Sequence, residues 1–448
     1  MSGLKFGTDG VRGRFGEDVD ATLAWWVGYA CARALGGPLA VGRDTRPSSP
    51  ALASAALAGA RAGGAAVVDY GVLPTPALAW AVRERGARGG IMITASHNLA
   101  DDNGLKVLGP GGEKADEALR SAIEGWLGRS RVPPELYPRG DATRGTIVDW
   151  RPLATLDLHG VHVVFDSANG AAHLLGPTLL RAAGAQVTTL GDGDGRKINR
   201  HCGATHPEAL LSAVESAGAD VGIALDGDGD RLAMVVHRAV GNAGGALDGD
   251  AMLWILAQDL EPGATVVGTV MSNLALEQGI TARGGRFERA AVGDAEVWAR
   301  MEATGAPMGG EPSGHIMFRG EGAPVGSCGL STAARVLSVG QPALRERLGR
   351  WKPAFQRHGM VPVTQASAAI RRVEGSARKL AVTAQVATVA GALAGEGARV
   401  VVRPSGTEPI IRAMVEHADA AVAEAGLLRL MAALSDDTTG DENIGSTP

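Results

Sequence analysis

The sequence has few cysteines and no long uninterrupted apolar segment. Its three cysteines, Cys31, Cys202 and Cys328, form no Cys-x-x-Cys pair, which argues against structural zinc and thioredoxin-type redox chemistry. A sparse, odd set of cysteines is typical of a reducing compartment. No window of 18 apolar residues is free of charged or turn residues, and no apolar signal segment opens the chain. We therefore expect a cytoplasmic protein with no membrane partner.

An excess of positive charge is also absent. The formal net charge is -5 and the pI is near 6.1, so the chain has no overall electrostatic footprint for nucleic acid, and we expect no such partner. Hydrophobic residues make up 45% of the chain and charged residues 20%, which is a globular composition. The 65 glycines suit a protein whose loops bring backbone close to a ligand.

Short apolar segments alternate with alanine-rich or amphipathic segments along most of the chain. This alternation predicts α/β units, in three blocks of similar length and a fourth that begins near residue 361. No residue-level repeat joins the blocks, and 448 residues exceed one ordinary core. We predict domains at 1–152, 153–247, 248–357 and 358–435, followed by a disordered acidic tail at 436–448.

The most informative loop runs from Asp226 to Arg231 with the sequence DGDGDR. Three carboxylates at alternate positions can surround one hard cation such as Mg²⁺, and the glycines permit a tight turn. The apolar segment 221–225 predicts a buried strand, so the loop follows the strand's C-terminal end, where open α/β sheets bind ligands. An EF-hand is excluded, because Arg231 and His237 occupy its glycine and glutamate positions. A solvated acidic turn is the plainer alternative.

A second acidic string, 192–195, has only two acids, and we interpret it as a turn. Another polar loop, 94–98, follows a predicted strand, and its Ser96 could be a nucleophile or a phosphoryl carrier. It is not a hydrolase nucleophile elbow, which needs glycines on both sides of the serine. We expect His97 to brace the loop with its ring turned away from Ser96. A phosphorylated Ser96 could complete the metal site.

Lys106 follows the Ser96 loop by ten residues. A lysine beside a dianion and a metal could move a proton or stabilise charge, although a lone lysine is more often on the surface. Two glycine-containing loops come later in the chain. In 309–315, Glu311, Ser313 and His315 could hydrogen-bond sugar hydroxyls or an amine, with a tight turn as the alternative.

The last of these loops, 403–409, is rich in groups that bind anions. Its arginine, hydroxyls and backbone N–H groups around glycine suit a phosphate monoester, and its spacing is not that of a Walker loop. Arg412 could add a second positive contact or pair with Glu416.

Together the loops resemble those of the α-D-phosphohexomutase superfamily, in the family's order and over nearly the whole chain. The motifs are TASHN at 94–98, DGDGDR at 226–231, GEPSGH at 310–315 and RPSGTEP at 403–409. Three further stretches resemble bacterial phosphoglucosamine mutases: FGTDGVRG at 6–13, VGTVMSN at 267–273 and VGD at 292–294. The resemblance implies three similar α/β domains with mixed sheets and a smaller C-terminal α+β domain, all around a central cleft.

The resemblance also implies a reaction and the residues that perform it. Phosphoserine 96 would convert glucosamine 6-phosphate to glucosamine 1-phosphate through the 1,6-bisphosphate, with one Mg²⁺ and glucose 1,6-bisphosphate or a similar compound as primer. The implied residues are Ser96, Lys106, Arg12 and Arg231 for catalysis; Ser96, Asp226, Asp228 and Asp230 for the metal; Glu311, Ser313 and His315 for the sugar; and Arg403, Ser405, Gly406, Thr407 and Arg412 for the phosphate that is not transferred.

Three places depart from the family's usual pattern. Leu99 replaces a proline, Ala295 and Glu296 replace an arginine and an aromatic residue, and 327–329 replaces a Gly-Asp-Gly-like string. These changes bear on sugar selectivity, so a phosphomannomutase or phosphoglucomutase is an alternative, and a non-catalytic sugar-phosphate-binding protein is a further one. The expected partners are small sugar phosphates, with a homodimer left open.

Overall fold

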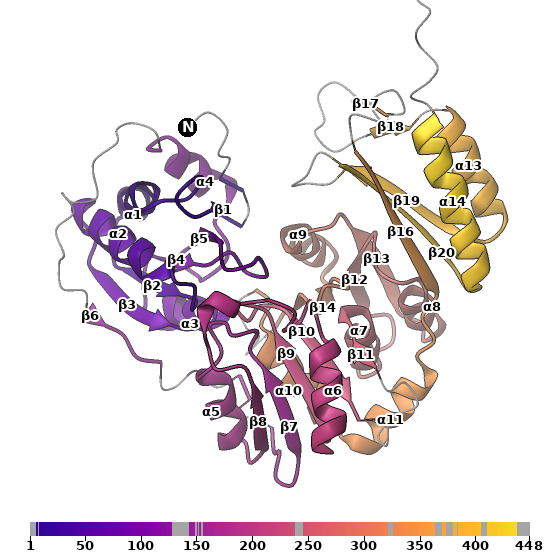
Figure 1. Cartoon of the computed structure of the whole chain (residues 1–448), viewed down its shortest axis with the longest axis horizontal. Coiled ribbons are helices and arrows are strands. Elements are labelled where there is room, and N and C mark those ends of the chain that lie inside the picture. Colours follow the sequence, from indigo (N-terminus) through magenta and orange to yellow (C-terminus); the bar gives the residue numbers. More distant parts are fainter. Residues whose placement is uncertain are drawn as a thin grey trace, which may run out of the picture. The chain divides into compact units, whose positions relative to one another are not determined.

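The computed structural model divides into two compact units, each described here by itself (Figure 1). The first comprises Met1–Thr269 and Gly284–Arg350, and the second comprises Val270–Arg283 and Trp351–Pro448. The tail that we expect to be disordered lies outside the described residues from 437 onward. The structure describes residues 6–7, 9–127, 143–147, 150, 152–153, 156–237, 245–320, 326–362, 370–372, 380–382, 384–404 and 410–436.

The first unit contains three mixed sheets that repeat one four-strand plan. In each sheet a central strand pairs in parallel with the next two strands of the chain. The second of these then pairs antiparallel with the strand that follows it. The shared orders are β5-β4-β2-β3, β10-β9-β7-β8 and β15-β14-β12-β13. The prediction of mixed α/β sheets is confirmed, and the repetition appears in topology although no residue repeat is visible.

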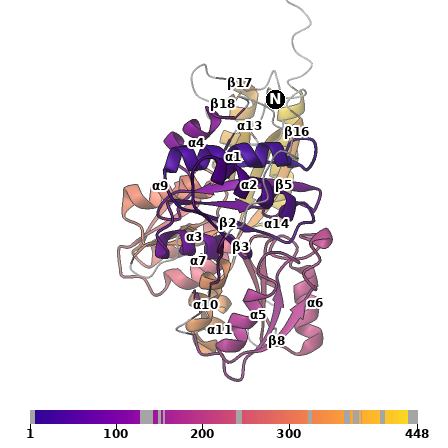
Figure 2. The ribbon, with the colours of Figure 1, turned by 90° about the vertical axis from the view of Figure 1, so that its left-hand side faces the viewer.

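The first sheet has the order β1-β5-β4-β2-β3-β6. Its helices α1 and α2 lie side by side because each has a glycine at the crossing (Figure 2). A Cβ at Gly28 would lie 2.1 Å from the carbonyl oxygen of Ala56, and one at Gly59 would lie 1.9 Å from that of Trp25. The elements are β1 (Val11–Arg14), α1 (Ala21–Leu35), β2 (Leu39–Arg43), α2 (Ser49–Ala62), β3 (Val67–Val72), α3 (Thr75–Glu84), β4 (Gly89–Ile93), β5 (Asp102–Leu108), α4 (Glu117–Glu124) and β6 (Thr143–Arg144).

The second sheet has the order β11-β10-β9-β7-β8 and carries the acidic loop. Every residue of β9 and β10 is buried, which explains their almost continuous apolar sequences. The two strands pair antiparallel, with Leu225 opposite Leu232, so that 226–231 forms the connection. The elements are β7 (His162–Asp166), α5 (Leu175–Ala182), β8 (Gln186–Leu190), the 3₁₀ helix η2 (Gly195–Lys197), α6 (Glu208–Ala217), β9 (Val221–Leu225), β10 (Leu232–Val236) and β11 (Ala246–Leu247).

The third sheet has the order β13-β12-β14-β15. The Asp248 side chain caps the helix before it, because it accepts a hydrogen bond from the backbone N–H of Ala251. The elements are α7 (Gly249–Ala257), β12 (Thr265–Thr269), β13 (Arg286–Ala290), α9 (Asp294–Thr304), β14 (Met308–Gly310), β15 (Ile316–Phe318), α10 (Gly329–Ser338) and α11 (Gln341–Arg350).

The second unit is built on an antiparallel sheet, β16-β20-β19, with its own apolar core (Figure 1). Arg399 fixes the segment that precedes α8 to this unit, because its guanidinium donates to the carbonyl oxygens of Val270 at 2.6 Å and Ser272 at 2.8 Å. The elements are α8 (Leu274–Ala282), β16 (Phe355–Pro362), β17 (Ile370–Arg372), β18 (Leu380–Val382), α13 (Ala384–Gly395), β19 (Arg399–Pro404), β20 (Ile410–His417) and α14 (Ala420–Asp436).

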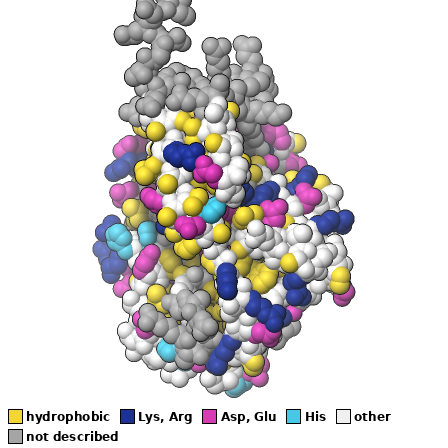
Figure 3. Space-filling model, turned by 90° about the vertical axis from the view of Figure 1, so that its right-hand side faces the viewer, with side chains coloured by type: hydrophobic (Ala, Val, Ile, Leu, Met, Phe, Trp, Pro, Cys, Tyr) yellow, Lys and Arg dark blue, Asp and Glu magenta, His cyan; other side chains and the backbone are white. Residues whose placement is uncertain are grey.

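On the face in Figure 3, basic and acidic side chains are interspersed among polar and apolar ones. None of the described helices has both the length and the apolar character that crossing a bilayer requires. The domain boundaries at 152, 247, 357 and 435 stay predictions.

Candidate active site

In each of the three sheets, the loop between the last two strands of the four-strand plan carries a predicted motif. The Ser96 loop joins β4 to β5, the acidic loop joins β9 to β10, and the 311–315 loop joins β14 to β15. Each motif therefore follows the carboxyl end of a buried strand. This is the edge at which α/β sheets place their ligands.

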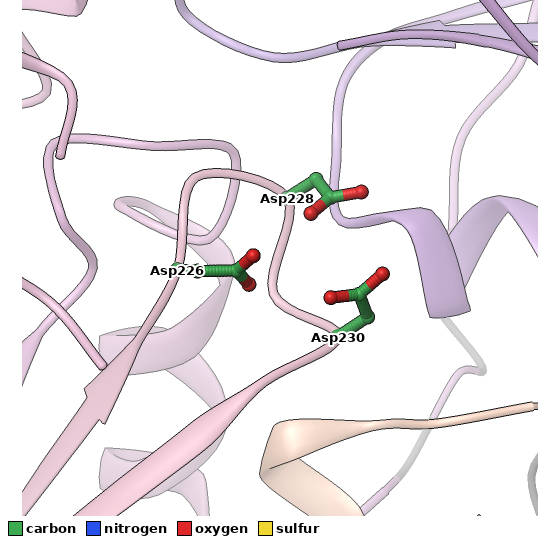
Figure 4. Close-up of side chains that lie close together, drawn as sticks. All are labelled: Asp226, Asp228 and Asp230. Carbon is green, nitrogen blue, oxygen red and sulfur yellow. The ribbon is translucent and has the colours of Figure 1, made fainter. Parts of the chain in front are cut away.

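The three aspartates of the acidic loop converge (Figure 4). One carboxylate oxygen from each of Asp226, Asp228 and Asp230 lies within 4.8 Å of the others, and all three residues are buried. The turn is held from within, because Asp226 Oδ1 accepts hydrogen bonds from the N–H groups of Gly229 at 3.1 Å and Arg231 at 3.2 Å. Gly229 has a φ of 76°, which a residue with a side chain rarely adopts.

The surrounding side chains partly compensate this concentration of negative charge. Lys106 Nζ donates to Asp228 Oδ2 at 2.6 Å and to Asp230 Oδ2 at 2.9 Å. The Thr75 hydroxyl donates to Asp228 Oδ2 at 2.6 Å. Asp228 Oδ2 and Asp230 Oδ2 are therefore both paired with side chains of the protein.

The carboxylates nevertheless retain an unmet demand for positive charge. Asp228 Oδ1 is buried and has no hydrogen-bond partner among the described residues, which is costly for a carboxylate. Burial, together with the neighbouring carboxylates of Asp230 and Asp228, raises the pKa of Asp226 to about 7. A cluster of buried carboxylate oxygens with one oxygen unpaired fits a hard divalent cation such as Mg²⁺.

Ser96 lies at this cluster. Its hydroxyl donates to Asp226 Oδ2 at 2.7 Å, and the residue is only 1% exposed. Its φ of 51° is in the left-handed region, which is strained for serine. The expected direction of the His97 ring is wrong, because His97 Nδ1 lies 3.4 Å from Ser96 Oγ.

Lys106 is 3% exposed, so the alternative of a surface lysine is wrong. Burial opposes its charged form, but Asp228 and Asp230 outweigh burial and raise the pKa of Lys106. Burial lowers the pKa of His97 to about 4, with further contributions from Arg231 and Arg12. Of the four residues predicted to be catalytic, Ser96 and Lys106 contact the aspartates, Arg231 belongs to the acidic loop, and Arg12 is near enough to affect the pKa of Lys106.

The 311–315 loop is tied to the acidic loop. His315 Nε2 lies 2.9 Å from Asp230 Oδ1, and His315 Nδ1 lies 3.3 Å from Glu311 Oε2. Burial opposes the charged ring, but Asp230 outweighs it and raises the pKa of His315 to about 10. Ser313 is exposed on the same turn. The structure thus joins the predicted sugar loop to the predicted metal loop, while its role toward a sugar stays a prediction.

The predicted phosphate-binding residues belong to the second unit. Arg403 on β19 lies directly opposite Arg412 on β20, so the strand register puts two positive charges side by side. Like charges in this position destabilise a sheet unless an anion is bound. Glu416 receives hydrogen bonds from Arg399 at 2.6 Å and Gln356 at 3.0 Å. Ser405, Gly406 and Thr407 lie outside the described residues.

Two residues of one departure from the family pattern, 327–329, have structural roles. The Ser327 hydroxyl donates to the carbonyl oxygen of Asp230 at 2.6 Å and accepts from the N–H of Ile316 at 3.0 Å, so it ties the acidic loop to β15. Cys328 is the N-cap of α10, and its sulfur lies 3.5 Å from the N of Ser331. Leu99 is 54% exposed.

Sequence reasoning missed several residues that hold the site together. Thr75 binds Asp228, and Lys114 forms ion pairs with both Asp9 and Asp294. Asp9 in turn pairs with Arg12, at 2.9 Å between Oδ2 and Nη2. Apart from the Asp9–Arg12 pair, these contacts join residues from distant parts of the chain, so no local sequence pattern predicts them.

Comparison with known proteins gives matches along the whole chain. The phosphoglucomutase/phosphomannomutase alpha/beta/alpha domains I, II and III match residues 3–130, 144–241 and 248–351, and the C-terminal domain of that family matches 361–433. The chain is 40% identical to phosphoglucosamine mutase of Synechococcus elongatus, with 93% of this chain and 90% of the relative aligned. It is also 40% identical to phosphoglucosamine mutase of Alkalilimnicola ehrlichii, with 93% and 94% aligned.

Solved structures share the fold. A phosphoglucomutase/phosphomannomutase family protein from Burkholderia thailandensis superposes with a TM-score of 0.74 at 26% identity, covering 96% of both chains. Aspergillus fumigatus N-acetylphosphoglucosamine mutase, solved with GlcNAc-6P and magnesium, gives a TM-score of 0.67 at 16% identity, covering 97% of this chain and 96% of that one. At that identity the likeness shows the fold alone.

Proposed function

This chain belongs to the phosphoglucomutase/phosphomannomutase family, and on this premise we propose that it is a phosphoglucosamine mutase. It would interconvert glucosamine 6-phosphate and glucosamine 1-phosphate. The observation that carries the proposal is the hydrogen bond of 2.7 Å from Ser96 Oγ to Asp226 in a cluster of three buried carboxylates. A serine in this setting suits a phosphoryl carrier. A metal ion beside it would compensate the negative charge of the three carboxylates.

Ser96 would begin and end each catalytic cycle as phosphoserine. The bond from its Oγ to phosphorus breaks while a new bond forms to O1 of glucosamine 6-phosphate, and the proton of the O1 hydroxyl ends on Ser96 Oγ. The resulting 1,6-bisphosphate reorients, the bond from O6 to phosphorus breaks as Ser96 Oγ takes that phosphoryl group, and the proton of the serine hydroxyl ends on O6. Glucosamine 1-phosphate then leaves. Lys106 is our candidate general acid/base, and Arg12 and Arg231 are candidates for stabilising the charge of the transferring group.

Mg²⁺ is the proposed cofactor, with Ser96, Asp226, Asp228 and Asp230 as the residues that would hold it. When bound, it would neutralise charge on the transferring phosphoryl group. The orphaned oxygen of Asp228 supports this assignment. Glucose 1,6-bisphosphate or a similar compound is the proposed primer that first loads Ser96.

The remaining loops would select and hold the substrate. Glu311, Ser313 and His315 are proposed to bind the sugar. The loop with Arg403, Ser405, Gly406 and Thr407, together with Arg412, is proposed to bind the phosphate that is not transferred. The identity to phosphoglucosamine mutases favours the amino sugar over mannose or glucose phosphate. A cytoplasmic location and small sugar phosphates as the partners are part of the same proposal.

The test is a turnover assay with three sugars. Purified protein with Mg²⁺ and a trace of glucose 1,6-bisphosphate is given glucosamine 6-phosphate, glucose 6-phosphate or mannose 6-phosphate, with Ser96→Ala as the control. We expect the amino sugar to be converted much faster than the hexoses, and only by protein with Ser96. Preference for a hexose phosphate would replace the proposal by a phosphoglucomutase or phosphomannomutase. Turnover of none of the three would favour a binding protein.

A further inference from the structure

Backbone strain in the described part of the chain is concentrated near one loop. Five described residues other than glycine have positive φ values, a strained conformation that persists only where the surrounding structure imposes it. One of them, Asn199, donates from its backbone N–H to the carbonyl oxygen of another, Ala168, at 3.0 Å. The five residues are Ser96, Ala168, Asn169, Asn199 and His201.

Arg46 holds the strained Ser96 loop from within the first sheet. The guanidinium is completely buried, and its Nε pairs with Asp44 Oδ2 at 2.9 Å. Nη2 donates to the carbonyl oxygens of Ser96 at 3.0 Å and Asn98 at 2.8 Å. Nη1 donates to those of Leu99 and Asp102. All five N–H groups of the side chain are therefore used, four of them on the backbone that surrounds Ser96.

Asn199 grips the same two carbonyl oxygens from the second sheet. Its Nδ2 donates to the carbonyl oxygens of Ser96 and Asn98, both at 2.8 Å, and the residue is 2% exposed. Its Oδ1 is buried without a partner. The amide cannot be reversed, because the oxygen would then face two carbonyl oxygens. The Asn199 side chain thus leaves Oδ1 unsatisfied, which costs free energy, while Nδ2 holds the Ser96 loop.

Asn199 also lies against the acidic loop. A Cβ at Gly227 would come 2.8 Å from Asn199 Nδ2 and 2.5 Å from the carbonyl oxygen of Ser96. The amide therefore fills the space between the loop that carries Ser96 and the loop that carries the aspartates. Moving it would remove one of the two side-chain hydrogen bonds on the Ser96 carbonyl, the other being that from Arg46.

We propose that Asn199, together with Arg46, is a positioning residue for phosphoryl transfer. It holds the carbonyl of Ser96 so that the strained residue keeps its Oγ on Asp226. This inference rests on the proposed mutase function and adds a residue that acts through the backbone of Ser96. Phosphoryl transfer depends on in-line positioning, and a displacement of about 1 Å can cost a hundredfold in rate.

Asn169 offers a matched control. It is also an asparagine with positive φ, at 55° against 57° for Asn199, so glycine relieves similar strain at both positions. Its Oδ1 accepts from the N–H groups of Asp192 and Gly193, at 3.1 and 3.2 Å, and not from the Ser96 loop. We expect Asn199→Gly to lower kcat for glucosamine 6-phosphate about tenfold to a hundredfold, with KM changed less than about threefold. Asn169→Gly should keep kcat within about twofold of wild type.

Asn199→Asp gives a second, stricter test. Aspartate tolerates positive φ but replaces the amide donor by an oxygen facing the two carbonyl groups, so kcat should fall further than in Asn199→Gly. Thermal melting and Mg²⁺ affinity, which a merely structural role would change first, should match those of Asn169→Gly. Equal kcat in Asn199→Gly and Asn169→Gly, or wild-type kcat in Asn199→Asp, would overturn the inference. An inactive wild type would instead remove the proposed function on which it rests.

Discussion

Two strings in this chain read Asp-Gly-Asp-Gly, at 192–195 and at 226–229, and they have little else in common. The first follows β8, whose residues are exposed or half-buried, and it leads into the short helix η2. The second connects two strands that are buried at every position. The same four-residue sequence thus follows a largely exposed strand in one place and lies between two buried strands in the other.

The environments decide how the acids are compensated. Asp194 pairs with the nearby Arg196 at 2.9 Å and caps η2, while Asp192 is 72% exposed and lies 3.9 Å from Lys197. Water and local basic residues satisfy these charges. In the buried string the groups that compensate Asp228 come from other parts of the chain, and one of its oxygens has no partner among the described residues. Burial of the flanking strands, more than the acidic residues themselves, therefore distinguishes the second string as the candidate metal site.

The sharpest test of this comparison removes one carboxylate from each string. We expect Asp228→Asn to lower mutase kcat about a thousandfold. The substitution removes a negative charge from the proposed metal site and weakens the interaction of this side chain with Lys106. Steady-state turnover of glucosamine 6-phosphate measures the effect. Asp192→Asn is the matched control and should stay within about twofold of wild type. Similar losses in the two variants would break the distinction between the strings.

Metal binding should distinguish the two strings in the same way. If 226–230 holds Mg²⁺ in the folded protein only, an Mg²⁺ concentration one hundred times the Kd should add about 2.7 kcal/mol to the free energy of unfolding. Melting with and without Mg²⁺, after EDTA treatment, checks this for wild type, Asp228→Asn and Asp192→Asn. The shift should vanish in Asp228→Asn and persist in Asp192→Asn. A persistent shift in Asp228→Asn would place the metal elsewhere.

Glycine should matter in both strings, in contrast to the acids. A Cβ at Gly227 would lie 2.5 Å from the carbonyl oxygen of Ser96, and one at Gly195 would lie 1.8 Å from that of Thr45. We expect Gly227→Ala and Gly195→Ala each to cost about 1–3 kcal/mol of the free energy of unfolding, since the backbone must move. Denaturant unfolding measures the cost. Only Gly227→Ala should also lower kcat, and an equal loss in Gly195→Ala would contradict the comparison.

The smallest effect concerns the exposed pair of the first string. Hydrogen bonds from the Arg196 side chain and backbone lower the pKa of Asp194. A lowered folded-state pKa gives stability that is present above the unfolded value, near 4, and is lost as the pH falls through the folded value. Asp194→Asn should therefore lower the melting temperature slightly at neutral pH and not at all once the carboxyl is protonated. A larger difference in acid than at neutral pH would contradict this.

Local sequence predicted the elements of the site but not what holds them. The strand β9 has the predicted bounds, and the three aspartates converge as their alternation with glycine suggests. Spacing could not reveal Arg46 or Asn199, because their partners lie about 50 and 100 positions away. Arg46 follows a strand in an ordinary-looking loop, and its complete burial becomes visible only when the chain is folded. Contacts between residues of different sheets depend on how the sheets pack. The sequence immediately around each residue does not indicate that packing.

The repeated four-strand plan has a consequence for how chemistry can change in this scaffold. In each sheet the third and fourth strands are neighbours, so the loop between them starts and ends at nearly the same separation, about 4.8 Å across the ladder. The anchoring geometry is therefore common to the serine loop, the acidic loop and the 311–315 loop. Packing constrains the strands that hold these loops, while the loops themselves differ in sequence. One mode of attachment thus holds three loops of different chemistry, and because Ser96 bonds to Asp226 and His315 to Asp230, a substitution in one loop acts on its neighbour as well.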